Sequence, residues 1–99
     1  MRGCGMPSAL RDAAERLKVA LKETPNDVIC RHALGDCYFK MGAYERATEA
    51  LEPLKDHPWK DTRQKTYPLL EECYKATNRL LELANLKKKI AEEIESEGT

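Results

Sequence analysis

The sequence lacks an excess of charge of either sign and lacks any long apolar run. Lys and Arg together number 17 and Asp and Glu number 17, so the formal net charge at pH 7 is +0. Proteins that bind nucleic acids or acidic membrane surfaces through general electrostatic attraction carry a basic excess, which is missing here. A helix that crosses a bilayer needs roughly 18 consecutive apolar residues, and no segment approaches that length. We therefore expect neither a nucleic-acid partner nor a membrane partner.

Residues that would mark a catalytic or metal site are also scarce. The only serines are Ser8 and Ser96, near the two ends of the sequence. The four cysteines are too far apart to form the C-x-x-C pair of zinc ribbons and redox motifs: Cys4, Cys30, Cys37 and Cys73. An enzyme would need a nucleophile with its base, paired carboxylates in a cleft or a metal cluster. We expect none of these, and hence no enzyme activity, no metal and no cofactor.

The cysteines and the first residues also bear on the compartment. Residues 1–7 contain two glycines and Pro7 but no apolar core of a signal peptide, so we expect a flexible leader. An intracellular, cytoplasmic location without disulfides follows as the default expectation. Free cysteine is among the most often buried residue types, so the cysteines are expected to fill helix contacts. A metal or redox pair is the alternative.

What the sequence does contain is apolar residues at helical spacing. Segments of this kind, separated by turn signals, predict about five helices. They lie at residues 9–24, 28–41, 44–54, 62–77 and 79–96. Pro68 lies well inside the fourth segment, where we expect a kinked helix, with a later start near Tyr67 as the alternative. Thr77 and Asn78 give only a weak turn signal, so one long helix through this point is the rival topology.

Two further expectations concern packing. Gly35 lies in a helix interior, where Gly costs roughly 1 kcal/mol relative to Ala. We expect the missing side chain to let the following helix approach the backbone closely, with Gly42 providing the left-handed turn between the two helices. Pro53 predicts a bend or an early stop in the third helix. Trp59, in the connection that follows, is expected to pack on the end of the preceding helix pair.

The segments repeat one another along the chain. Ala13, Leu17 and Ala20 recur 34 residues later as Ala47, Leu51 and Leu54, and Leu34, Tyr38 and Gly42 recur 36 residues later as Leu70, Tyr74 and Asn78. A fixed period of this size is typical of helix–turn–helix repeats. The chain resembles tetratricopeptide repeat proteins, which implies an all-α fold of antiparallel helical hairpins stacked as a short superhelix.

The resemblance is carried by a set of signature residues. In the best repeat these are Leu34, Gly35, Tyr38, Gly42, Tyr44, Ala47 and Leu51. Arg31 stands where the family often has Trp; in the second repeat Glu71 replaces the glycine and Leu83 the small alanine, which predicts looser packing. We expect one domain over residues 8–97, divided into a half repeat (8–27), a full repeat (28–61) and a degenerate repeat (62–95).

The resemblance implies a scaffold that binds a peptide or a partner helix on the inner face of the stack, which the first helices of the repeats line. In this register the partner-binding candidates are Ile29, His32, Asp36, Phe39, Lys40, Lys65, Glu72 and Lys75. Phe39 is expected to be exposed there. Asp36 and Glu72 stand where some family members place two asparagines that grip a terminal carboxylate, so that ligand class is rejected. The identity of the partner does not follow from the sequence.

A narrower similarity concerns the stretches Pro25–Gly42, Trp59–Asp61 and Leu69–Glu71. They are similar to the helical region that follows the thioredoxin-like domain of bacterial chaperedoxin-type proteins, which implies contacts with chaperones or client proteins, or a role in assembly. The alternative function is self-association as part of a larger multi-repeat protein. The first helix has no preceding partner, so its face is expected to be exposed and to form homo-oligomers; this face comprises Leu10, Ala14, Leu17 and Leu21.

Overall fold

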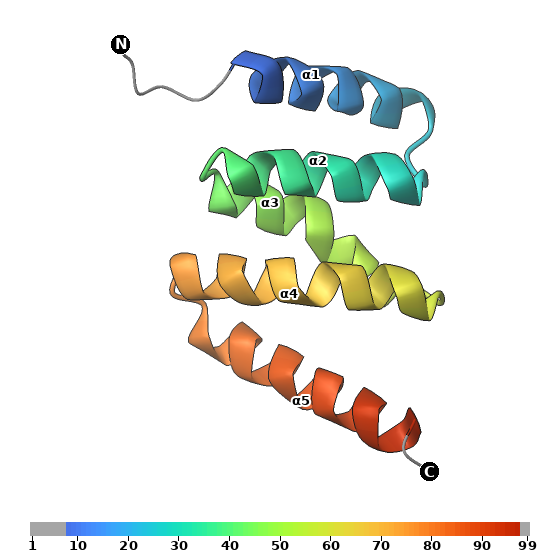
Figure 1. Cartoon of the computed structure of the whole chain (residues 1–99), viewed down its shortest axis with the longest axis vertical. Coiled ribbons are helices and arrows are strands. Elements are labelled where there is room, and N and C mark those ends of the chain that lie inside the picture. The colour runs from blue at the N-terminus through green and yellow to red at the C-terminus, as the bar shows by residue number, and fades with distance from the viewer. Residues whose placement is uncertain (1–7, 98–99) are drawn as a thin grey trace.

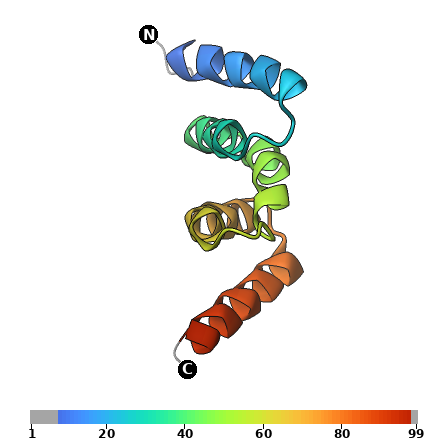
Figure 2. The same cartoon turned by 90° about the vertical axis from the view of Figure 1, so that its right-hand side faces the viewer.

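A computed structural model describes residues 8–97 and shows a stack of helices. The elements are α1 (Ser8–Glu23), α2 (Val28–Lys40), α3 (Tyr44–Leu51), the 3₁₀ turn η1 (Glu52–Leu54), α4 (Lys60–Ala76) and α5 (Leu80–Glu97). Successive helices run in opposite directions along the stack (Figure 1). In the perpendicular view α2 and α4 lie on one side and α3 on the other (Figure 2). The predicted all-α architecture with five helices is confirmed; the leader at residues 1–7, with Cys4, falls outside the described residues.

The α2–α3 turn and the α4–α5 turn each contain a residue with left-handed backbone geometry. Gly42 has φ 78° between α2 and α3, and Asn78 has φ 59° between α4 and α5. The hydrogen bonds repeat as well, because Ala43 N donates to Tyr38 O at 2.9 Å and Arg79 N donates to Tyr74 O at 2.9 Å. This pattern closes a helix with a left-handed residue at its end. The rival topology, one long helix through Asn78, is therefore wrong.

The prolines shape the second half of the stack. At Pro53 the α-helix gives way to η1, as expected from the loss of a backbone donor. At Pro68 the helix continues, so α4 begins at Lys60 and the alternative start near Tyr67 is wrong. The prediction for Trp59 is also wrong, because its side chain is 67% exposed. Its ring meets the His57 ring edge-on at a centroid distance of 5.3 Å.

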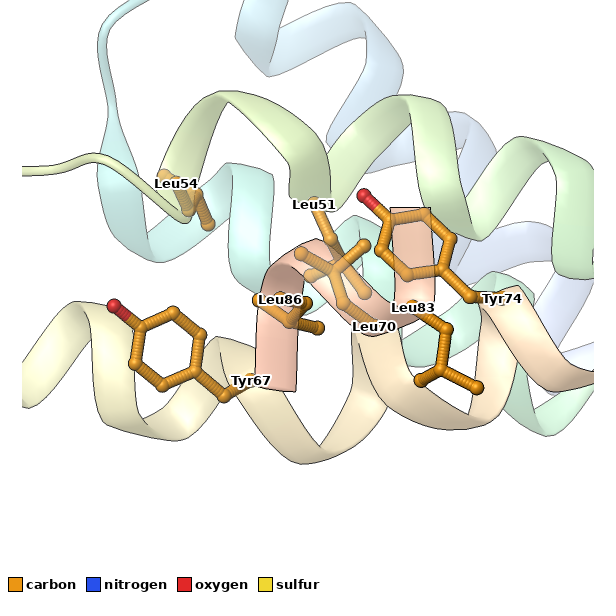
Figure 3. Close-up of a cluster of buried hydrophobic side chains, with 7 residues drawn as sticks. All are labelled: Leu51, Leu54, Tyr67, Leu70, Tyr74, Leu83 and Leu86. Carbon is orange, nitrogen blue, oxygen red and sulfur yellow. The ribbon is translucent and has the colours of Figure 1, made fainter. Parts of the chain in front are cut away.

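The interior consists of two adjoining clusters of buried side chains. The first joins α3, η1, α4 and α5 through Leu51, Leu54, Tyr67, Leu70, Tyr74, Leu83 and Leu86 (Figure 3). The second joins α1 to α4 through Ala14, Leu34, Tyr38, Ala47, Ala50 and Cys73. Cys73 is fully buried, and burial raises the pKa of its thiol. Cys30 and Cys37 are only half-buried free thiols, so complete burial is found for Cys73 alone among the described cysteines.

Gly35 lies where α2 and α3 come closest together. A Cβ atom placed on Gly35 would lie 2.5 Å from both Cγ and Cδ2 of Leu51, a residue with no exposed surface. No real Cβ tolerates such a contact, so only glycine allows the two helices to pack at this distance. The expectation that Gly35 permits a close helix approach is therefore confirmed.

The expected exposed face of α1 is not exposed. Ala14 is 2% exposed and belongs to the second cluster, against which Leu17 and Leu21 also pack, and Leu10 is half-buried. The reason is that this apolar stripe packs against α2 and the second cluster. Val19 is the large apolar residue of α1 that remains exposed, at 57%.

Candidate functional site

A groove lies between the first helices of the two hairpins, α2 and α4. It encloses about 330 Å³ and is open to solvent on one side. Its lining consists of Val28, Ile29, His32, Ala33 and Asp36 from α2 and of Thr62 and Lys65 from α4. We call this the α2–α4 groove. It exists because α3 packs behind α2 and α4, which leaves the facing surfaces of these two helices uncovered (Figure 2).

The structure brings four of the eight candidate residues together in this groove: Ile29, His32, Asp36 and Lys65. Phe39 is half-buried rather than exposed, because its ring packs edge-on against Tyr44 at 5.6 Å and against the second cluster. The remaining three candidates, Lys40, Glu72 and Lys75, are exposed and do not line the groove. Sequence reasoning missed three lining residues, Val28, Ala33 and Thr62. The spacing of Val28 and Ala33 around Ile29 and His32 on one helix is the signal that could have found those two.

The charges near the groove are largely compensated. Lys40 Nζ lies 3.1 Å from Asp36 Oδ2, and Lys75 Nζ lies 3.3 Å from Glu72 Oε2. Each pair lies within a single helix and is solvent-exposed, so the two pairs neutralise the carboxylates without adding much stability. Within residues 8–97 the ammonium group of Lys65 forms no ion pair, and His32 Nε2 lies 3.5 Å from the Lys65 carbonyl oxygen. The groove therefore presents apolar surface beside one uncompensated cation.

A polar cluster at one end of the stack fixes α4 relative to α5. Arg63 donates through Nε and Nη2 to Glu93 Oε1 at 3.3 and 3.0 Å, and Tyr67 donates to Glu93 Oε2 at 2.6 Å. Arg63 also donates to the carbonyls of His57 and Pro58. The hydrogen bonds from Arg63, and next that from Tyr67, lower the pKa of Glu93, while burial and then Glu93 raise the pKa of Tyr67 to about 12. This cluster holds the groove helix α4 in place through α5 and the preceding loop.

Glu93→Gln is expected to destabilise the protein by about 1–2 kcal/mol at pH 7, since it removes charge-assisted hydrogen bonds. Because the pKa of Glu93 is lower in the folded than in the unfolded state, its contribution is present above the unfolded pKa and is lost as the pH falls through the folded pKa. Urea midpoints at pH 7, 5 and 3 should therefore converge for wild type and variant as the pH falls. Glu92→Gln, at the neighbouring exposed position, is the control; a pH-independent gap for Glu93→Gln would contradict this account.

Two absences hold for the part of the chain that the structure describes. Residues 8–97 contain no group of three or more His, Cys, Asp or Glu side chains that could hold a metal ion. In the same range no helix has the length and apolar character needed to span a bilayer.

Comparison with known families identifies the architecture. A family profile of the tetratricopeptide repeat matches residues 8–66, which is more than half of the chain. The chain therefore belongs to the tetratricopeptide repeat family, whose helical hairpins generally serve as scaffolds for protein–protein interaction. The match ends within α4, before the positions at which Glu71 and Leu83 depart from the repeat pattern. Comparisons with curated proteins and with solved structures gave no match.

Proposed function

We propose that the α2–α4 groove binds a segment of a partner protein, inserting one apolar side chain beside Ile29 and placing an acidic side chain near Lys65. The observation that carries this proposal is the exposure of Ile29, which is 82% although it lines a cavity. A ligand that covers such a side chain gains roughly 25 cal/mol for each Å² of apolar area removed from water. The groove is thus a surface whose burial by a partner is favourable.

The charges narrow the class of segment. The Asp36 carboxylate in the groove is paired with Lys40 and offers no donor to a terminal carboxylate, whereas Lys65, unpaired within residues 8–97, attracts a single negative side chain. We therefore expect an internal segment with an apolar residue followed or preceded by Asp or Glu, bound in extended form or as a helix. Contacts with chaperones or clients, which the narrower similarity implies, would use the same groove. In the proposed division, a half repeat (8–27) comes first, and the two repeats that follow form the walls of the groove. The full repeat (28–61) supplies the wall on α2, and the degenerate repeat (62–95) supplies the wall on α4.

The proposal is tested with peptides selected from a random library on the wild-type protein. Ile29→Asp should weaken the selected peptides by about tenfold or more, because it replaces apolar contact surface with a charge that must be desolvated. Lys65→Glu should shift the selected sequences from acidic to basic residues. Fluorescence anisotropy with labelled peptides measures both effects.

Val19→Asp is the matched control for Ile29→Asp. Val19 is a β-branched residue exposed on α1, at 57%, and does not line the groove. Its replacement should leave the affinity of the selected peptides unchanged, with the far-ultraviolet circular dichroism of all variants unaltered. Equal losses for the two aspartate variants, or unchanged affinity for Ile29→Asp, would show that the groove is not the binding surface.

A further inference from the structure

A second cavity lies on the stack and shares no residue with the α2–α4 groove. It encloses about 330 Å³ and is formed where α1, α2 and α3 meet. Its apolar lining is largely buried, since Leu34 and Tyr38 are each 7% exposed and Ala50 is 6% exposed. Its charged lining consists of Lys18 from α1, Arg31 from α2, and Arg46 and Glu49 from α3. We call it the three-helix pocket.

The two arginines of the three-helix pocket are positioned by neutral groups. Arg31 Nη2 donates to the carbonyl oxygen of Pro25 at 2.9 Å. The guanidinium carbon of Arg46 lies 6.0 Å from the centre of the Tyr38 ring. Within residues 8–97 neither guanidinium has a carboxylate partner, in contrast to Arg63, which pairs with Glu93 at 3.0 Å. Arg31 and Arg46 are therefore oriented but keep their full positive charge.

The charge balance of the pocket supports the same conclusion. Three cations line it against one carboxylate, Glu49, while the only carboxylate paired with Lys18 in the described chain is Glu15 at 3.7 Å. That pair is exposed and weak. The protein as a whole has no net charge, so the excess of two positive charges is a local property of this pocket.

A comparable cavity one hairpin further along has no such excess. It encloses about 300 Å³, and its charged lining residues are Lys55, Asp56, Glu82 and Lys89. Two carboxylates thus balance two cations, and Lys89 Nζ lies 3.1 Å from Asp56 Oδ1. The position equivalent to Arg31, 36 residues later in the repeat, holds the buried Tyr67. The next hairpin therefore has an aromatic ring where the three-helix pocket has a cation.

We propose that the three-helix pocket binds a phosphate group carried on a side chain of a partner protein. Guanidinium groups present forked donors that match the oxygens of a phosphate, and a doubly charged anion gains most from uncompensated arginines. The cavity volume lies at the lower end of the range for small ligand sites, which suits one phosphorylated side chain. A phosphopeptide is favoured over an anionic membrane surface, because Glu49 lines the pocket, Glu15 pairs with its Lys18, and both carboxylates would oppose a broad negative surface.

The test uses a short neutral peptide that carries one phosphoserine, the same peptide without phosphate, and inorganic phosphate as separate probes. Backbone amide chemical shifts of the full chain report the site and the affinity of each probe. The phosphopeptide and inorganic phosphate should both shift the amides around Arg31 and Arg46, with the phosphopeptide binding more tightly, and the unmodified peptide should not. Arg31→Gln combined with Arg46→Gln should weaken binding by about tenfold or more.

Two further variants make the result specific. Glu49→Gln removes the opposing carboxylate and should strengthen phosphopeptide binding several-fold, which a merely structural role for Glu49 would not produce. Lys55→Gln, in the cavity of about 300 Å³ whose charges balance, should change nothing. If the double arginine variant fails to fold, Lys18→Gln, at an exposed position, should still weaken binding. Equal binding of phosphorylated and unmodified peptide, equal losses for Lys55→Gln, or binding to phosphatidylserine vesicles without binding to the phosphopeptide would each overturn the proposal.

Discussion

Replacing Gly35 by alanine is expected to lower the free energy of unfolding by about 2 kcal/mol, although alanine is the better helix former. The added methyl would lie 2.5 Å from Cγ and Cδ2 of Leu51 and 3.2 Å from Cδ1. Leu51 has no exposed surface, so it cannot move aside without disturbing the first cluster. Overpacking of this kind costs up to about 3 kcal/mol, which exceeds the gain of about 1 kcal/mol in helix propensity. Urea unfolding followed by circular dichroism measures the difference.

A double-mutant cycle isolates the contact between Gly35 and Leu51. In a Leu51→Ala background the steric conflict disappears, so Gly35→Ala should become neutral or stabilising by up to about 1 kcal/mol. This change of sign is the diagnostic result. Destabilisation of equal size in both backgrounds would show that Gly35 is needed for a reason other than close packing against Leu51.

Leu70→Ala is expected to destabilise the protein by about 3–4 kcal/mol, the usual range for a fully buried leucine. Leu70 has no exposed surface and lies in the first cluster with Leu51, Tyr74 and Leu83 (Figure 3). Because this cluster joins α3, α4 and α5, the cavity left by truncation weakens the α3–α4 and α4–α5 interfaces at once. Thermal unfolding should show a melting temperature lower by about 15–25 °C for a domain of this size.

Leu81→Ala is the matched control for Leu70→Ala. Leu81 carries the same side chain on α5 but is 76% exposed. Its truncation should change the free energy of unfolding by no more than about 0.5 kcal/mol. Similar losses for the two variants would mean that the first cluster is not the cooperative core of the stack.

The hairpin architecture could be predicted from the sequence because local chemistry determines it. Gly42 and Asn78 lie at equivalent places 36 residues apart, and both adopt the left-handed backbone that ends a helix. Pro53 ends an α-helix for an equally local reason. Gly35 also indicated a tertiary contact. Because glycine is unfavourable in a helix interior, its presence there correctly predicted a close helix approach, which the structure shows to be against Leu51.

What could not be predicted depends on contacts between distant segments. The exposure of Trp59 could not be predicted, because whether an element covers its ring depends on how the helices pack around the connection that carries it. Phe39 and Leu17 were placed by helical register alone, and register does not tell which flank a neighbouring helix covers. The groove was predicted only in part for the same reason, since its wall at Thr62 requires knowing how α4 lies against α2.

Partner segments are proposed to bind in the α2–α4 groove, and mapping a selected peptide by backbone amide chemical shifts tests this binding site directly. We expect the largest shifts on residues 28–36 of α2 and 62–65 of α4, and we expect them to disappear with Ile29→Asp. Largest shifts on α1 around Val19 or on α5 around Leu81, with α2 and α4 unaffected, would contradict this expectation.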